Sequence, residues 1–176
     1  MSKLKTMFGA LAIGAIAASG ALAQESSTNQ VAVNTAWNVF VEDDPKECWS
    51  VSTPEDVVNT RDGRVVAATR SQIVLMVFYR PSDEAKGQVA YTGGYPFRSG
   101  STVTLQIGES SFSLFTDGEW AWPASESDDA KIVTAMKRGA QAVVSGVSGR
   151  GTATKDTFSL LGFTASVEDA EARCAQ

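Results

Sequence analysis

The sequence contains no histidine among its 176 residues, and this absence excludes several kinds of chemistry. Ser-His-Asp and Cys-His nucleophile systems need an imidazole as the general base, and most zinc sites use one as a ligand. Histidine is also the side chain best suited to change its charge near neutral pH. We therefore expect no triad hydrolase, no metal site and no cofactor.

The sequence also lacks an apolar run long enough to cross a membrane. A short apolar stretch from Met7 to Ala18 follows the cations Lys3 and Lys5, and the polar stretch Gln24 to Gln30 comes after it. Ala21-Leu22-Ala23 supplies the small-x-small pattern that signal peptidase cleaves. This order predicts a signal peptide over residues 1–23 that is cleaved after Ala23. An uncleaved anchor would need a longer apolar core, so we expect a periplasmic or secreted protein with no integral membrane segment after cleavage.

Cysteine is scarce, because only Cys48 and Cys174 are present. In an exported chain, two cysteines with no others in the sequence typically form a disulfide bond. Two free thiols or a metal pair are the alternatives, and a metal pair would need further ligands that are absent. We predict a Cys48–Cys174 disulfide that brings the start and the end of the domain together.

Positive charge is in deficit, since 15 Lys and Arg residues face 20 Asp and Glu residues for a formal net charge of −5. Loss of Lys3 and Lys5 with the signal peptide makes the remaining chain more acidic still. Such a surface has no excess of cations to replace the counterions of phosphates. Nucleic acid is therefore not expected as a partner.

The exported part of the chain is about the size of one domain. We predict a flexible leader over residues 24–35 and one domain over residues 36–176. Within that domain, Ile73 to Tyr79 is apolar at every position and predicts a central strand, while Thr102 to Ile107 alternates apolar and polar residues as a half-buried strand does. Asp62-Gly63 predicts a hairpin turn.

Helical signals are few. Ser127 is the predicted cap of an amphipathic helix that stops at Gly139, and Glu168 to Arg173 is compatible with a last helical turn. Many short strands with one helix favour a mainly β fold, an antiparallel β-sandwich with one short α-helix.

Two patterns have simpler interpretations than the sites they resemble. The glycine-rich segment Gly146 to Gly151 lacks the Gly-Lys-Ser/Thr ending of a phosphate loop, so we interpret it as a strand-turn-strand corner. Glu42-Asp43-Asp44 and Asp128-Asp129 do not follow the ligand order of a calcium loop. We interpret them as a solvated turn and a helix start.

Aromatic residues beside turns are the candidates for a binding surface. Core packing accounts for most of the large rings, but Tyr95 and Phe97 flank Pro96, and Trp120 and Trp122 precede Pro123. Exposed aromatic side chains are common in binding surfaces. A peptide, a glycan or a partner protein could use these four residues.

The second half of the chain resembles the invasion associated locus B family. The most specific stretch contains Arg150-Gly151-Thr152 and Asp156-Thr157-Phe158-Ser159-Leu160-Leu161-Gly162-Phe163, and Tyr91 to Phe97, Leu114 to Trp122 and Met136 to Ala140 are also similar. The resemblance implies an exported bacterial envelope protein with an immunoglobulin-like sandwich and no defined catalytic residues. Many relatives carry a cysteine where Val41 stands here and a cysteine pair near the tryptophans, so their disulfide scheme cannot be transferred.

Three functions are compatible with this sequence. The first is a non-catalytic interaction or support role with an unidentified envelope or host protein, in which host invasion belongs only to host-associated relatives. The second is a periplasmic module that binds a peptide, glycan or small molecule in a concave site lined by the aromatic residues. The third is a histidine-free hydrolase that would use carboxylates such as Asp117, Glu119 and Asp156. We expect the first, and no enzymatic activity.

Overall fold

The computed structural model describes residues 29–83 and 85–175, and all structural statements below concern these residues. They form twelve strands, two α-helices and one 3-10 helix, η1 (Pro81–Asp83). The strands are β1 (Gln30–Asn34), β2 (Trp37–Asp43), β3 (Lys46–Ser52), β4 (Asp56–Arg61), β5 (Arg64–Val65), β6 (Val74–Arg80), β7 (Ala85–Thr92), β8 (Thr102–Ile107), β9 (Ser110–Asp117), β10 (Trp120–Trp122), β11 (Gln141–Val147) and β12 (Ala153–Ser159). The helices are α1 (Glu126–Arg138) and α2 (Phe163–Cys174).

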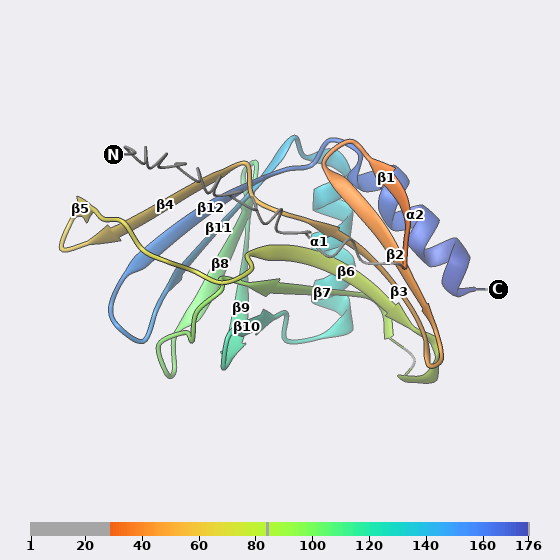
Figure 1. Ribbon diagram of the computed structural model, residues 1–176, viewed down its shortest axis with the longest axis horizontal. Helices are drawn as coiled ribbons and strands as arrows, with labels where there is room; N and C mark the ends of the chain where they lie inside the picture. Colours follow the sequence, from red (N-terminus) through yellow and green to blue (C-terminus); the bar gives the residue numbers. More distant parts are fainter. Residues whose placement is uncertain (1–28, 84, 176) are drawn as a thin grey trace, which may run out of the picture.

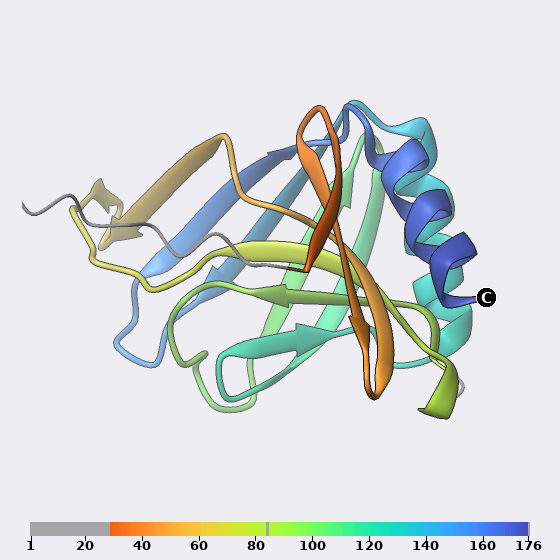
Figure 2. The ribbon, with the colours of Figure 1, turned by 45° about the vertical axis from the view of Figure 1, so that its right-hand side comes forward.

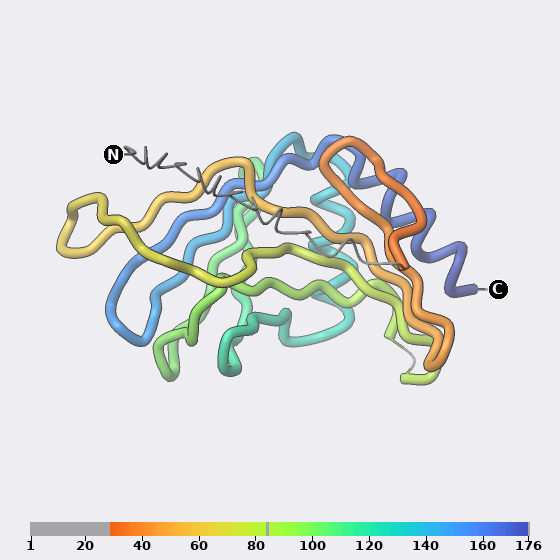
Figure 3. The backbone as a smooth tube through the Cα atoms, viewed as in Figure 1, coloured from red at the N-terminus to blue at the C-terminus, as the bar shows by residue number. Residues whose placement is uncertain are grey.

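All twelve strands belong to one hydrogen-bonded antiparallel sheet (Figure 1). Its order is β1-β2-β3-β6-β7-β10-β9-β8-β11-β12-β4-β5. The sheet bends, so that the segment leading from β5 into β6 passes in front of β11 and β12, and in the turned view β6 and β7 pass in front of β8 (Figures 1 and 2). The two helices lie together at one end, while the β4–β5 hairpin and the β11–β12 turn lie at the other end (Figures 2 and 3).

The core lies between the two halves of the bent sheet and under the helices. Strand β8 shows the predicted alternation, because Val103 and Leu105 are fully buried while Thr102 and Thr104 are exposed. Large apolar side chains buried in this way each contribute about 1.5–3 kcal/mol to folding. The predicted central strand is β6, whose residues are buried on both faces except Met76 and the terminal Arg80.

The N-cap of helix α1 lies two residues before the predicted cap. It is Ser125, not Ser127, because the Ser125 hydroxyl accepts a hydrogen bond from the Asp128 N–H at 3.3 Å and donates to the Asp128 carboxylate at 2.8 Å. The helix ends at Gly139 as predicted, where the Gly139 N–H donates to the carbonyls of Ala135 and Met136. The prediction of one short helix is wrong, since α2 is a full helix of 12 residues.

Helix α2 closes the molecule onto the first strands. Its Phe163 packs edge-on against Trp37 of β2, with ring centroids 4.8 Å apart. The Ser166 hydroxyl accepts a hydrogen bond of 2.7 Å from Ser50 of β3. At the end of α2 the predicted disulfide is present, because Cys174 is bonded to Cys48 across a Cα–Cα distance of 5.7 Å. The start and the end of the domain are therefore covalently joined.

The structure confirms some of the predictions about fold class and domain bounds and contradicts others. The mainly β class and the two-residue turn at Asp62-Gly63 are confirmed, the latter joining β4 to β5 with positive φ at both residues. The predicted flexible leader is wrong for residues 30–34, which form the ordered strand β1 against β2. Residues 1–28, with the predicted signal peptide, lie outside the described residues. The narrower immunoglobulin-like description stays a prediction, because the strands share one continuous sheet.

Candidate functional site

A buried ionic cluster joins three distant parts of the chain. Asp156 of β12 is fully buried, and the side chain of Arg70, from the segment between β5 and β6, is 5 % exposed. The Arg70 guanidinium donates to both carboxylate oxygens of Asp156, with 2.7 Å between Nη1 and Oδ1. The hydroxyl of Tyr91 in β7 also donates to Asp156. The cluster therefore links β7 to β12 across the core.

The cluster uses nearly all of its own hydrogen-bonding capacity. Besides Asp156, the Arg70 guanidinium donates to the Gly93 carbonyl at 2.7 Å, to Asn59 Oδ1 at 3.3 Å and to the Tyr91 hydroxyl at 3.4 Å. These contacts account for all five guanidinium N–H donors. Burial acts to lower the pKa of Arg70, but the hydrogen bond and the charge of Asp156 outweigh it and raise that pKa. Burial, followed by the charge of Asp156, raises the pKa of Tyr91. Arg70 is thus held charged and Tyr91 neutral.

A pocket of about 600 Å³, here called the polar pocket, opens over this cluster. Its lining is made by segment 67–71, by Asn59 and Arg61 of β4, by residues 94–96 with Glu119, and by the β11–β12 turn with Thr154. The Tyr95 ring lies beside Arg70, with the guanidinium carbon 5.1 Å from the ring centroid, and its hydroxyl is 2.5 Å from Thr154 Oγ1. Burial raises the pKa of Tyr95 despite this hydrogen bond.

A close backbone approach fixes the shape of this pocket. The Ser71 N–H donates to the Gly94 carbonyl at 3.0 Å. Gly94 has a φ of +70°, and a Cβ placed there would lie 2.8 Å from the Ser71 carbonyl oxygen. Only glycine permits both the conformation and this approach. Segment 67–71 is therefore held against the tip that carries Tyr95.

The charges at the pocket mouth are predominantly positive. Arg61 and Arg150 both line the pocket and are exposed, and Arg61 Nη2 donates to Thr152 Oγ1 at 2.6 Å. Glu119 is the exposed acidic residue of the lining. Asp156 is already paired with Arg70, so the mouth carries more positive than negative charge.

The glycine-rich segment forms the turn of the β11–β12 hairpin, as predicted. Its backbone donors are used within the protein, since the N–H groups of Ser148, Gly149 and Gly151 donate to carbonyls and that of Thr152 donates to the Ser148 hydroxyl. The turn therefore does not present a cradle of free N–H groups to a phosphate.

The four aromatic candidates are divided into two pairs. Tyr95 lines the polar pocket and meets Phe97 edge-on at 5.0 Å, but Phe97 itself is buried in the core at 7 % exposure. Trp120 and Trp122 stack on one face of β10 with centroids 5.8 Å apart, and Trp120 is 36 % exposed. Trp122 also packs edge-on against Phe78 of β6. The binding role of the four residues stays a prediction, and only Tyr95 lines a described pocket.

The three candidate carboxylates lie in different environments. Asp156 is buried and paired, whereas Asp117 at the end of β9 and Glu119 in the following turn are exposed. The sequence indicates Asp156 as a candidate but does not indicate its partner. Arg70 lies in an irregular segment 86 residues before Asp156, and no local pattern marks their pairing.

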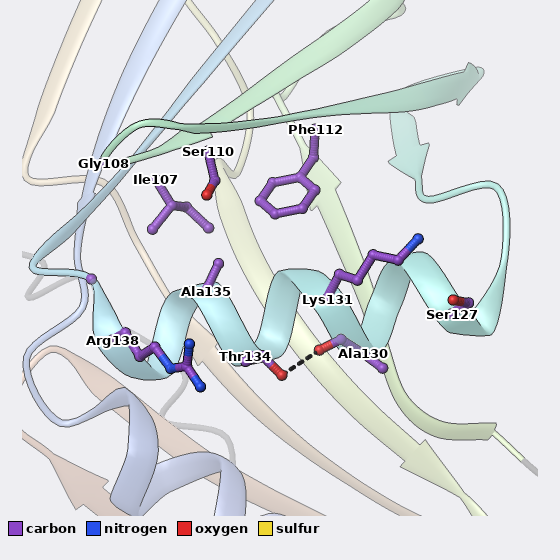
Figure 4. A pocket seen from close by; sticks show the side chains of 11 residues that line it. Ile107, Gly108, Ser110, Phe112, Ser127, Ala130, Lys131, Thr134, Ala135 and Arg138 are labelled. Carbon is purple, nitrogen blue, oxygen red and sulfur yellow. Dashed lines mark hydrogen bonds between the residues drawn. The ribbon is translucent and has the colours of Figure 1, made fainter.

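A second hollow of about 700 Å³ lies between α1 and the β8–β9 hairpin (Figure 4). Its floor is apolar, because Ile107 and Phe112 of the hairpin and Ala135 of the helix point toward one another. Lys131 and Arg138 stand at its edge, and Lys131 is already paired with Asp128 at 2.8 Å. This groove has no buried ionic cluster behind it, so the polar pocket is the stronger candidate.

Two further properties concern the described residues only. They contain no group of three or more acidic or cysteine side chains arranged to hold a metal ion. Neither α1 nor α2 is long and apolar enough to cross a membrane.

Comparison with known proteins identifies relatives of the whole domain. The family model described as "Invasion associated locus B (IalB) protein" matches residues 37–171. A solved structure titled an invasion associated protein B from Bartonella henselae superposes with a TM-score of 0.56 and 16 % sequence identity, covering 82 % of this chain and 98 % of that one. At this identity the likeness shows the fold alone. No curated protein matches the chain.

Proposed function

Since the chain belongs to the invasion associated locus B family, we propose that it is an exported protein of the bacterial cell envelope that acts by binding and not by catalysis. The polar pocket is the place where a ligand would bind. Host-cell invasion is not included, because the likeness to the Bartonella protein extends only to the fold.

One observation carries the non-catalytic part of this proposal: the saturation of Asp156. A carboxylate acts as a nucleophile or general base only if an oxygen can reach the substrate. Both oxygens of Asp156 accept hydrogen bonds from Arg70, and Tyr91 adds a further one. Among the described residues of the pocket lining, Glu119, which is exposed, is then the one carboxylate that is free to act. A paired-carboxylate hydrolase would need two.

A panel of ester, glycoside, peptide and phosphate substrates tests this part. We expect no turnover above the blank with the wild-type protein or with Glu119→Gln. Turnover that disappears in Glu119→Gln, while the variant stays folded, would contradict a binding-only role.

The envelope location is supported by the N-terminal sequence pattern and by the disulfide, which is stable in oxidising compartments. Cell fractionation combined with the intact mass of the recovered protein tests it. We expect a chain that begins at Gln24 in the periplasmic or medium fraction. Recovery of a full-length, reduced chain from the cytoplasm would overturn the proposal.

A second candidate function is interaction with a partner protein through the outer face of β9 and β10. It is favoured by the exposure of Phe115 at 48 % and Trp120 at 36 %, which lie beside Trp122 on adjacent strands. Aromatic residues with this exposure are enriched in protein interfaces. Photo-crosslinking from position 120 in intact cells distinguishes this face from the polar pocket.

A further inference from the structure

We propose that the polar pocket selects a small ligand carrying two anionic groups, carboxylate or phosphate, which Arg61 and Arg150 hold at the mouth. This inference rests on the proposed binding function and adds the chemical class of the ligand.

The charge of the pocket is opposite in sign to that of the whole chain. The chain as a whole has a formal net charge of −5, yet the pocket lining contains three arginines and one glutamate. Arg70 is neutralised by Asp156 behind it, which leaves Arg61 and Arg150 against Glu119. A concave, positively charged site on a negatively charged molecule raises the local concentration of anionic ligands.

Arg61 and Arg150 keep hydrogen-bond donors available for a ligand. Arg61 Nη2 donates to the neutral Thr152 hydroxyl, and no ion pair joins Arg61 or Arg150 to an acidic residue within the described chain. The bond to Thr152 also draws Arg61 toward the turn that carries Arg150. The planar guanidinium fork matches carboxylate and phosphate oxygens in pairs, as an ammonium does not.

The pocket has the size of a small-molecule site, and contacts within the protein hold its lining in place. Its volume of about 600 Å³ is that of a small-molecule site and is too small for a folded partner. The Arg70–Asp156 pair and the contact of Gly94 with Ser71 fix two of its walls. A wall fixed before binding lowers the entropic cost of holding a small ligand.

Nuclear magnetic resonance titration of the disulfide-bonded protein, starting at Gln24, tests the inference. The acidic probes are citrate and inorganic pyrophosphate, and the neutral probe is triethyl citrate. We expect citrate, pyrophosphate or both to shift the amide signals of residues 94, 149, 150 and 152, and added salt to weaken the effect. Which acid binds more tightly distinguishes a carboxylate source from a phosphate source.

Matched variants assign the effect to the proposed residues. Arg61→Gln and Arg150→Gln should each weaken binding about tenfold, because each removes a charge-assisted hydrogen bond. Arg64→Gln is the control, since Arg64 is exposed on β5, is paired in register with Arg61 and does not line the pocket. It makes the same change in net charge and should alter affinity by about twofold or less.

Three results would overturn the inference. They are equal binding of triethyl citrate, equal effects of Arg64→Gln and Arg150→Gln, and no shift of the pocket signals by either acid. Binding of the neutral probe alone in the pocket would refute the anion selectivity and leave the binding function standing. Chemical conversion of a bound probe would instead refute the binding-only function.

Discussion

At the scale of single residues, Asp156 and Arg70 illustrate how a buried charge pair constrains a small domain. A buried ion pair adds little net stability compared with an apolar pair, but loss of one partner leaves an uncompensated charge in the core. Arg70 lines the polar pocket and is bonded to the buried Asp156 of β12, so their pairing sets the position of segment 67–71 relative to β12. The pair thus acts on architecture more than on total stability.

Asp156→Asn should therefore destabilise the protein by about 3–5 kcal/mol, because Arg70 would remain buried without a counter-charge. Urea denaturation followed by circular dichroism measures the change. Asp117→Asn is the matched control, since Asp117 is exposed and its replacement should cost about 0.5 kcal/mol or less. Equal losses in the two variants would show that the buried pair does not exist in solution.

The three tyrosines make a second prediction at this scale, since they are the only tyrosines in the sequence. Burial is the first cause that raises the pKa of Tyr79, Tyr91 and Tyr95 above the ordinary value, and nearby carboxylates raise the pKa further. A pKa raised by folding means that the stabilising contribution is complete below about pH 10 and is lost as the pH rises beyond it.

Phenolate absorbance and circular dichroism, followed together through an alkaline titration, measure this effect. We expect little phenolate in the folded protein near pH 10, where tyrosine in an unfolded chain is about half ionised. Ionisation should appear together with unfolding. A tyrosine that ionises at its ordinary pH while the dichroism is unchanged would contradict the burial described.

At the scale of elements, the sequence predicts strands and turns better than it predicts irregular segments. Strand β8 covers the predicted range Thr102 to Ile107 because apolar and polar residues alternate there without interruption. Helix α2 is longer than the sequence predicts. Its N-cap is Gly162, which offers no side-chain acceptor, and its first residues carry no helix-start signal. Strand β1 lies in a polar stretch and is defined by pairing with β2.

The site depends on the least predictable element, the segment between β5 and β6. It contributes Arg70 and a whole wall of the pocket, yet its residues form no helix or strand. The position of Tyr95 beside a turn predicts that it is a binding residue. The ion pair between Arg70 and Asp156 instead depends on contacts between distant parts of the fold. The pattern of neighbouring residues in the sequence does not predict such contacts.

Gly94→Ala tests how this segment is held. The substitution should destabilise the protein by about 2–4 kcal/mol, because alanine disfavours the positive φ and its Cβ would press on the Ser71 backbone. Gly100→Ala is the control, since Gly100 has nearly the same φ but nothing within 4 Å of an added Cβ, and it should cost about 1–2 kcal/mol. Thermal unfolding compares the two, and equal losses would exclude the close approach.

At the scale of the whole molecule, the disulfide joins β3, near the start of the sheet, to the end of α2. Cys48 and Cys174 are 126 residues apart in sequence, so their bond closes most of the domain into one loop. Scarcity of cysteine together with an export signal was enough to predict this bond. The arrangement of strands in one bent sheet was not predictable, because it depends on pairings between strands distant in sequence.

Replacement of both cysteines by serine should lower the free energy of unfolding by about 5 kcal/mol, the loop-closure value for a ring of this size. Urea denaturation of the oxidised protein and the double variant measures the difference. Mass spectrometry after alkylation without reductant provides the check on the bond itself. Two labelled cysteines in the untreated, exported protein would contradict it.

The central claim is that this domain binds a small acidic ligand in a preformed polar pocket and leaves it chemically unchanged. One sample tests it most directly: labelled protein with citrate or pyrophosphate, observed by nuclear magnetic resonance at both protein and ligand over many hours. We predict shifts at the amides around Gly94 and Arg150 with an unaltered ligand spectrum. Unmoved pocket signals, or a ligand converted to product, would contradict the account.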